Sequence, residues 1–411
     1  MTDPETDPTH APGEQGWLTR GVAGIGGASL LADLGHEIPT ALLPALLTST
    51  LGAPAAALGA IEGISDALAG AAKFAGGALA DDPHRRRNVA VGGYTATAVL
   101  SAGIGLATST WQVGILRAGA WTARGLRVPA RNALLADIVP PNTYGRAYGF
   151  ERAMDNLGAI FGPLAAIALI ASVGTRNAIL LSVIPGLAAA GAIIYAIRHT
   201  PKPQPQPKRP LRILIRPVLQ GPLRTLFAGI TAFELGNCAA TLLILRATDL
   251  LTAEHGPTTA TTLALGLYAA YNAAATGTSL VAGHYTDRAG ATRVFAAGIA
   301  AFALAYLGLT LNTTAWIMLL PWFLLAGIGI GCAETAEHAA VATHAPEHLR
   351  GSAFGLLAGV QSLGNLAASS IAGLLWTLLN PTWAFAYLTA WMLIALAALT
   401  RTPPARAEQQ N

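Results

Sequence analysis

Long apolar stretches recur along the whole chain, and they constrain its fold more than any other feature. Hydrophobic residues make up 53% of the 411 residues and charged residues only 11%, which is too little polar surface for a soluble protein of this size. Stretches long enough for a helix to cross about 30 Å of hydrocarbon lie at residues 18–49, 52–79, 88–109, 112–136, 146–173, 177–198, 223–251, 259–284, 293–311, 315–343, 352–378 and 383–400. The sequence therefore predicts an all-α integral membrane protein with twelve transmembrane helices.

A proline-rich, basic segment separates the sixth stretch from the seventh and divides the chain into two halves. We predict a disordered N-terminal tail, a six-helix bundle, a linker, a second six-helix bundle and a C-terminal tail at residues 1–17, 18–199, 200–222, 223–401 and 402–411. Lysine and arginine gather in the linker and in the other even-numbered loops, whereas only Arg176 stands out in the odd-numbered loops. Because basic loops stay in the cytoplasm, both tails are predicted to be cytoplasmic.

The two halves repeat each other at a constant offset. Residues of the same type are separated by 206 positions at Gly77 and Gly283, Asp81 and Asp287, Arg87 and Arg293, Pro140 and Pro346, Gly145 and Gly351, Gly149 and Gly355, and Gly158 and Gly364. One offset shared by seven pairs indicates a duplicated bundle. It predicts two pseudo-symmetric bundles related by an axis along the membrane normal, with a binding site between them near the bilayer midplane.

Two loops at equivalent places in the halves carry the same kind of motif. One reads GALADDPHRRR from Gly77, and the other reads GHYTDRAGATR from Gly283. Both resemble the loop signature G-x-L-x-D-R-x-G-R-R-R of the major facilitator superfamily of transporters, from which the first copy departs at Asp82 and His84. In that family the motif latches the cytoplasmic side and is broken and remade as the halves rock. The resemblance implies a latch of Gly77, Asp81, Arg85, Arg86, Arg87, Gly283, Asp287, Arg288 and Arg293.

The fifth stretch contains Gly149, Gly158, Gly162 and Pro163 within the sequence GFERAMDNLGAIFGP. Glycine costs about 1 kcal/mol and proline about 3 kcal/mol relative to alanine inside a helix, so the run indicates close helix contact and a bend. Its spacing resembles the antiporter motif of drug/proton antiporters in the same superfamily, although the final Gly-Gly pair of that motif is absent. The resemblance implies antiport. Small residues that only pack two membrane helices are the alternative.

Ionisable residues inside the apolar stretches are costly, at roughly 2.5–3.5 kcal/mol each near the bilayer centre, and the N-terminal half has many. A carboxylate in a poorly hydrated cavity holds a proton that it can exchange for substrate. The proton-coupling candidates near the midplane are Asp33, then Glu37, with Glu62, Asp66 and Arg124. In the alternative, Asp33 only pairs with Arg124 and stabilises the bundle. A group nearer the cytoplasm is predicted to form ion pairs at the gate, namely Arg127, Arg131, Glu151 and Asp155.

The C-terminal half has fewer ionisable residues within its stretches. The candidates for the wall of a substrate cavity are Glu234, Asn237, Glu334 and His338. Glu334 and His338 are four residues apart and share a helix face, a spacing that can hold a metal ion. No histidine-rich loop or second ligand cluster supports such a site. We therefore predict contact with substrate or with another helix, and no metal.

The resemblance and these residues together predict a secondary active transporter of the cell membrane that exports a small organic or drug-like compound in exchange for protons by alternating access. The alternatives are a metal or inorganic-ion exporter and a nutrient symporter of the same fold. The chain has no HExxH, GxSxG, Walker or dinucleotide-binding motif, so we expect no enzyme activity and no cofactor. We expect a monomer in the lipid bilayer that does not bind nucleic acid, because loop topology explains the net charge of +4.

Overall fold

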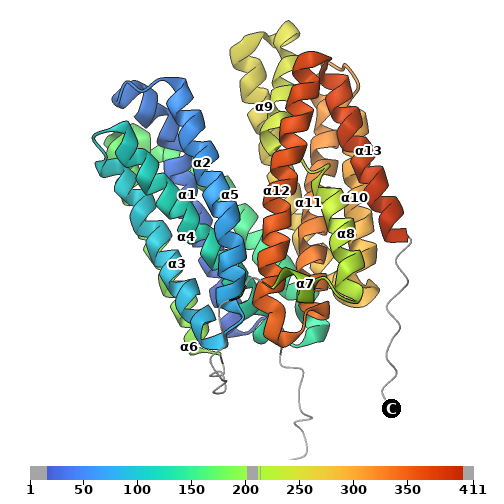
Figure 1. Ribbon diagram of the computed structural model, residues 1–411. Helices are drawn as coiled ribbons and strands as arrows, with labels where there is room; N and C mark the ends of the chain where they lie inside the picture. Colours follow the sequence, from blue (N-terminus) through green and yellow to red (C-terminus); the bar gives the residue numbers. More distant parts are fainter. Residues whose placement is uncertain (1–15, 201–211, 213, 401–411) are drawn as a thin grey trace, which may run out of the picture.

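The computed structural model describes residues 16–200, 212 and 214–400. Within these ranges the chain forms α-helices and short 3-10 or π-helical segments, without a β-strand. Helices of the two halves of the sequence stand as two groups side by side (Figure 1). The C-terminal tail, nearly all of the N-terminal tail and much of the linker predicted from the sequence lie outside the described residues.

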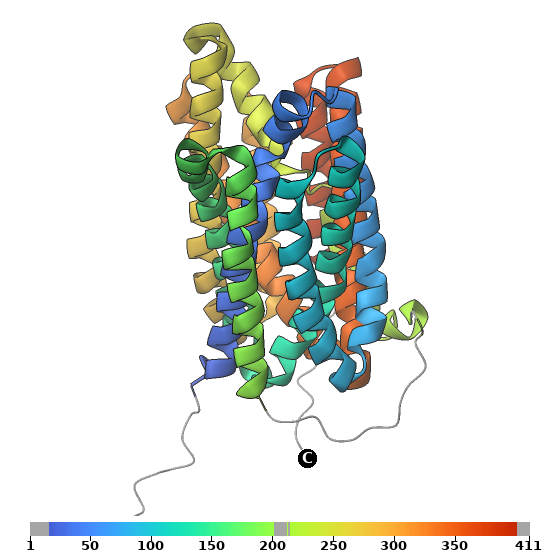
Figure 2. The ribbon, with the colours of Figure 1, turned by 90° about the vertical axis from the view of Figure 1, so that its left-hand side faces the viewer.

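The first group contains the helices of the N-terminal half, which face the viewer in Figure 2. In α5 the backbone turns at Gly174, whose φ of 77° favours glycine, so α5 combines the fifth span with the start of the sixth. The elements are α1 (Arg20–Ala45), η1 (Leu46–Thr50), α2 (Ala55–Ala80), α3 (Pro83–Gly103), η2 (Ile104–Leu106), α4 (Thr110–Asp137), η3 (Pro141–Thr143), α5 (Tyr144–Leu181) and α6 (Val183–Arg198).

The second group contains the helices of the C-terminal half. In α9 the backbone turns at Gly256, with a φ of 72°, so α9 combines the end of the seventh span with the eighth. The elements are α7 (Ile215–Val218), α8 (Pro222–Glu234), α9 (Ala240–Ala289), α10 (Ala291–Leu309), α11 (Trp316–His344), η4 (Glu347–Leu349), α12 (Arg350–Leu378) and α13 (Pro381–Thr400). When α5 and α9 are divided at these turns, α6 is joined to the end of α5, and α8 is joined to the start of α9, the described helices other than the short α7 form the predicted twelve spans in two bundles of six. This confirms the predicted fold.

The charges of the spans lie inside the bundles. On α4, the residues Arg117, Arg127 and Arg131 are each less than 5% exposed, whereas large apolar residues such as Leu106 and Ile167 are exposed. By length and composition alone, six helical segments of the described chain are apolar enough to cross a membrane: Arg20–Thr50, Pro83–Leu106, Pro141–Arg198, Ala291–Leu309, Trp316–His344 and Pro381–Leu399. α4, with 28 residues, is longer than three of these segments, but it carries arginines on the face that it turns inward.

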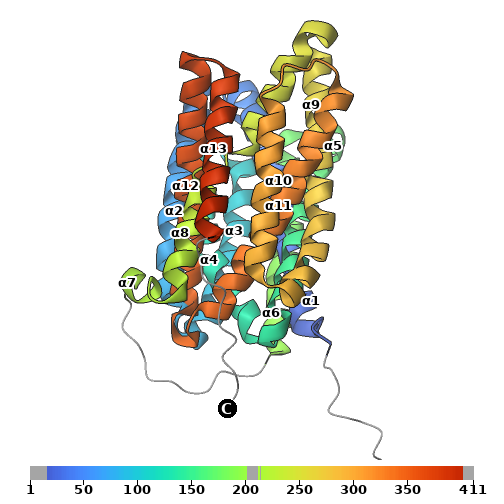
Figure 3. The ribbon, with the colours of Figure 1, turned by 90° about the vertical axis from the view of Figure 1, so that its right-hand side faces the viewer.

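The bundles contact each other mainly through two pairs of helices, α2 with α12 and α5 with α9. Figure 3 shows α2 beside α12. The contacts are closest at the end of the molecule where α2 ends at Ala80 and α9 ends at Ala289. We call this end the latch end.

Candidate functional site

Glycines allow the two bundles to touch through their main chains at the latch end. A Cβ atom on Gly77 would lie 2.7 Å from the main-chain oxygen of Gly351 and 2.8 Å from Cα of Gly355. A Cβ atom on Gly283 would lie 2.6 Å from the main-chain oxygen of Gly145. Real Cβ atoms do not approach this closely, so both contacts require glycine. These glycines belong to the repeat with the 206-residue offset, and the two contacts are therefore equivalent.

An aspartate beside each glycine contact caps a helix of the opposite bundle. Asp81 accepts a hydrogen bond from the main-chain N–H of Ser352 at 2.8 Å and another from the Ser352 hydroxyl. Asp287 accepts hydrogen bonds from the main-chain N–H groups of Gly145 at 2.6 Å and Arg146 at 3.1 Å, and it pairs with the Arg146 guanidinium at 2.8 Å. Carboxylates are stabilising at helix N-termini. Both aspartates and both glycines of the predicted latch thus lie between the bundles.

The arginines of the predicted latch are placed differently. Arg85 lies 3.5 Å from Asp82, the residue that caps α3, and Arg87 donates a hydrogen bond to a hydroxyl group of its own bundle. Arg288 and Arg293 are exposed. In this state the side chains of these arginines reach their own bundle or solvent, so the side-chain contacts that the two loops make with the opposite bundle come from the aspartates.

Arg86, which the resemblance assigned to the latch, lies beside a third contact between the bundles, and the loop motifs did not indicate the residue at its centre, Asp137. The Arg86 guanidinium pairs with Asp137 at the end of α4. Asp137 also pairs, at 3.2 Å, with Arg350 at the start of α12, and Arg350 donates to the Tyr144 hydroxyl at 2.9 Å. Asp137 therefore connects arginines of both bundles.

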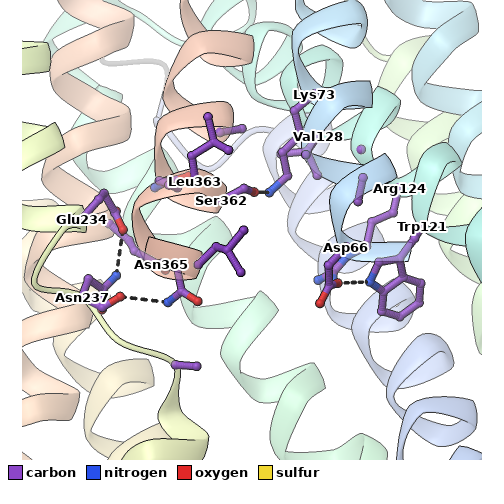
Figure 4. Close-up of a pocket in the computed structure, with 18 of the residues that line it drawn as sticks. Asp66, Lys73, Trp121, Arg124, Val128, Glu234, Asn237, Ser362, Leu363 and Asn365 are labelled. Carbon is purple, nitrogen blue, oxygen red and sulfur yellow. Dashed lines mark hydrogen bonds between the residues drawn. The ribbon is translucent and has the colours of Figure 1, made fainter. Parts of the chain in front are cut away.

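A cavity of about 620 Å³ lies between the bundles, on the far side of the latch contacts (Figure 4). Its lining comes from α1, α2, α4 and α5 of the first bundle and from α8, α11 and α12 of the second, together with the segment between α8 and α9. Many of the lining side chains are charged or carry an amide, including Asp33, Asp66, Lys73, Arg124, Arg152, Asp155, Glu234, Asn237, Glu334, Gln361 and Asn365. The four residues predicted for a cavity wall are all in the lining.

The wall of the cavity formed by the first bundle, called the first wall, carries a charged cluster around Asp33 of α1. The Asp33 carboxylate lies 3.2 Å from Nδ1 of His36 and 3.6 Å from the guanidinium of Arg124. Nε2 of His36 lies 3.2 Å from Glu37. Asp33 and His36 are buried, whereas the Arg124 side chain is 33% exposed. The predicted pairing of Asp33 with Arg124 is present, next to a histidine that the prediction had not included.

Only some of the predicted proton-coupling residues face the cavity. Asp66 does, and its carboxylate accepts a hydrogen bond from the indole N–H of Trp121 at 2.8 Å (Figure 4). Glu62 lies outside the lining and pairs with Arg117 at 3.0 Å. Glu37 is also outside it. The sequence predicted these acids to lie at a similar depth in the membrane. Depth along a helix, however, does not determine the direction in which a side chain points. The candidates that remain in the cavity are Asp33, Asp66 and Arg124.

Ion pairs connect α4 with α5 at the floor of the cavity. Arg131 lies 2.8 Å from Glu151 and 3.5 Å from Asp155. Arg152, which the predicted gate did not include, lies 2.7 Å from Glu151, 3.2 Å from Asp155 and 3.7 Å from Glu334 of α11. Arg152 is therefore the cation that extends these ion pairs to the opposite bundle.

Arg127 does not take part in the ion pairs predicted for it. Its guanidinium lies 4.0 Å from the ring centre of Tyr94 in α3, and the described residues contain no carboxylate paired with it. An aromatic ring thus takes the place of the predicted carboxylate, in a contact worth about 0.5–2 kcal/mol.

The wall formed by the second bundle, called the second wall, contains a break in the seventh span. The sequence predicted this span to be one continuous helix. α8 ends at Glu234 and α9 begins at Ala240. The Asn237 amide donates to the Glu234 carboxylate at 3.1 Å, and the Asn365 amide of α12 donates to the main-chain oxygen of Asn237 at 3.0 Å (Figure 4). The break therefore lies at the two predicted cavity residues of this span.

The side chains of Glu334 and His338 do not contact a common partner. Nδ1 of His338 hydrogen-bonds to the main-chain oxygen of Glu334 at 2.7 Å, and its ring packs against Tyr148 and Phe354. The Glu334 carboxylate faces Arg152. In the part of the chain that the structure describes, no three His, Cys, Asp or Glu side chains form a group suited to a metal ion.

Lys73 is a cavity residue that the sequence reasoning did not select. Its ammonium group reaches from α2 to the hydroxyl of Ser362 in α12 (Figure 4), and no ion pair of Lys73 occurs within the described ranges. The available signal was a single lysine inside an apolar stretch of the sequence.

The glycines of the fifth span serve two interfaces. A Cβ atom on Gly158 would lie 2.8 Å from Cβ of Asp33, and Gly162 also packs against α1. Gly149 instead contacts α9 of the other bundle, where its Cβ would lie 3.0 Å from Cα of Gly283. Pro163 lies within α5, which continues beyond it. The glycines therefore explain helix packing, while the antiport implied by their spacing stays a prediction.

Residues 25–250 and 230–411 match the family model described as Major Facilitator Superfamily. The chain belongs to the major facilitator superfamily. An uncharacterised protein of Mycobacterium tuberculosis is 28% identical over 372 residues, which cover 89% of this chain and 88% of the relative. An uncharacterised MFS-type transporter of Methanocaldococcus jannaschii is 26% identical over 372 residues, which cover 90% and 92% of the two chains.

Solved structures of other transporters have a similar fold. A bacterial homologue of the iron transporter ferroportin in an outward-facing state has a TM-score of 0.75 and 16% identity, covering 93% of this chain and 99% of that one. A human organic anion transporter has a TM-score of 0.71 and 16% identity, covering 92% and 99%. The protein is therefore a multi-pass membrane transporter of the major facilitator superfamily.

Proposed function

We propose that this transporter exports a small polar organic solute across the cell membrane in exchange for protons. The observation that carries the proposal is the cavity of about 620 Å³ between the bundles, walled by polar groups of both and separated from the latch end by two equivalent contacts. A solute bound there touches both halves. When the latch contacts break and the bundles rock, the same site becomes accessible from the other side of the membrane.

The cavity lining favours a polar solute over a lipophilic drug. The side of the cavity formed by the first bundle presents the cations Lys73 and Arg124 and the carboxylate of Asp33, and the side formed by the second bundle presents amide groups. A lipophilic molecule would displace water from these groups without replacing its hydrogen bonds, at a cost of about 1–3 kcal/mol for each group. A solute that carries both a cationic and an anionic group can pair with the Asp33 carboxylate and with these cations, and its other polar groups can hydrogen-bond to the amides of the second bundle.

Asp33 is the proposed carrier of the exchanged proton. Its carboxylate lines the cavity, and among the described residues Arg124, 3.6 Å away and partly exposed, is the cation from another helix that pairs with it. A cationic group of the solute and a proton would therefore compete for the same carboxylate. Such competition is the requirement for exchange of one against the other.

Transport in liposomes tests this function. The purified full-length protein is reconstituted with a pH-sensitive dye inside, a proton gradient is imposed, and zwitterions, sugars, lipophilic cations and divalent metals are added in turn. We expect proton movement opposite to a polar solute, lost in Asp33→Asn and kept in Asp249→Asn, whose side chain is 52% exposed. Proton movement in the direction of the solute would contradict exchange, and a response to metals alone would contradict an organic substrate.

A further inference from the structure

The C-terminal bundle contains two buried glutamates whose carboxyl groups are hydrogen-bonded to amides rather than to cations. Glu234, the last residue of α8, is 2% exposed, and Glu337 of α11 is fully buried. Neither forms an ion pair in the described part of the chain. Their carboxylates accept hydrogen bonds from amides instead, Glu234 from Asn237 at 3.1 Å and Glu337 from Gln361 at 3.0 Å. The mechanism proposed above uses neither carboxylate.

One of the two glutamates lines the cavity, and the other lies deeper in the protein behind it. Glu234 and Gln361 line the cavity, and Glu337 lies behind Gln361. The charged groups that act on the pair from the helices around it are Glu334 of α11 and Lys73 of α2. Lys73 is already hydrogen-bonded to a hydroxyl group across the cavity.

The hydrogen bonds of this pair fit neutral acids. An ionised carboxylate buried without a cation costs several kcal/mol, and two neighbouring carboxylates repel each other. Oε2 of Glu337 accepts the hydrogen bond from Gln361, whereas its Oε1 is buried with no hydrogen-bond partner among the described residues. Oε1 is therefore the position at which Glu337 can hold a proton without losing an existing contact.

We propose that Glu234 and Glu337 form a second proton site, separate from Asp33, at which both carboxyl groups are protonated in the state seen here. Glu234 lines the cavity and is the group that releases its proton to water there. When it does so, the Glu234 carboxylate becomes an anion and attracts Lys73 of the opposite bundle, which favours closure of the cavity. Because it describes how protons act on the transport cycle, this inference rests on the proposed function.

Infrared spectroscopy of the purified full-length protein tests the site without a substrate. A protonated carboxyl group has a carbonyl stretching band that an ionised carboxylate lacks. We expect such a band at neutral pH, shifted when the protein is labelled with ¹³C-glutamate. We expect Glu234→Gln and Glu337→Gln each to lose part of the band. Glu254→Gln, which removes an exposed acid of α9, serves as the control and keeps the whole band.

The absence of a glutamate band from the labelled wild-type protein at neutral pH would overturn the site, even if neither variant folds. A band left unchanged by both substitutions would also overturn it. Loss of the band in both variants, together with solute transport that is independent of a proton gradient, would support the site and refute proton exchange. An unchanged band with Asp33-dependent proton exchange would leave the proposed function intact and refute this inference.

Discussion

The carboxylate of Asp81 accepts a hydrogen bond from the main-chain N–H of Ser352 at 2.8 Å, so a residue of one bundle caps the first turn of a helix in the other. Asp287 and Arg146, each 206 positions from its counterpart, make the equivalent contact in the reverse direction. A carboxylate at a helix N-terminus is worth about 0.3–1 kcal/mol, and up to about 2 kcal/mol when partly buried. Contacts of this size can hold a latch and still break during transport.

Removal of one cap should loosen the latch. We expect Asp81→Ala to shift the equilibrium toward an open latch end by about 1 kcal/mol, or about fivefold. Ala353, at the start of α12, is buried. In an Ala353→Cys background, the rate at which this cysteine is alkylated should therefore rise about fivefold when the latch opens. The matched control is Asp82→Ala, which removes the cap of α3 within one bundle. An equal rise in both variants would contradict the latch.

The glycine contacts should be even less tolerant of change. We expect Gly77→Ala and Gly283→Ala each to cost about 1–3 kcal/mol in the closed-latch state, because the added Cβ meets main chain that cannot move alone. The same alkylation assay measures the shift. The control is Gly266→Ala in α9, where a Cβ would have no neighbouring atom within 4 Å and should leave the rate unchanged. Unaltered rates in all three variants would show that the main chains do not touch.

The ion pairs at the cavity floor should support stability. Arg152→Met leaves Arg131 as the cation that pairs with Glu151 and Asp155 among the described residues. We expect the substitution to lower the free energy of unfolding by about 3–5 kcal/mol, because one partner of a buried network is removed. Thermal unfolding in detergent measures this loss. The exposed Arg224 provides the comparison, since Arg224→Met should stay within about 0.5 kcal/mol. Equal midpoints for both variants would contradict a structural role of Arg152.

Sequence patterns were sufficient to predict the repeat and the division into two bundles. The common offset of Gly77 and Gly283 indicated a duplicated bundle, and the structure places these glycines at equivalent contacts between the bundles. Such glycines are visible in a sequence because a close approach of two main chains tolerates no other residue. The twelve spans could be predicted from length and hydrophobicity in the same way.

The partners of the charged residues could not be predicted as well. Periodicity places Arg127 and Arg131 on one face of α4, yet one contacts Tyr94 and the other contacts Glu151, because their partners depend on which helices pack on either side. The contact of Lys73 with Ser362 joins residues of different bundles. A single sequence does not specify which residues of two distant helices face each other.

Distances at both ends of the molecule test alternating access most directly. Spin labels at His84→Cys and Thr292→Cys report on the latch end, and labels at Thr108→Cys and Leu311→Cys report on the opposite end; all four positions are exposed, and Cys238 and Cys332 are replaced by alanine. When Gly77→Ala and Gly283→Ala are combined, we predict that the latch-end distance lengthens while the opposite distance shortens. Distances that stay unchanged, or that change in the same direction, would contradict the rocking of two bundles around a central cavity.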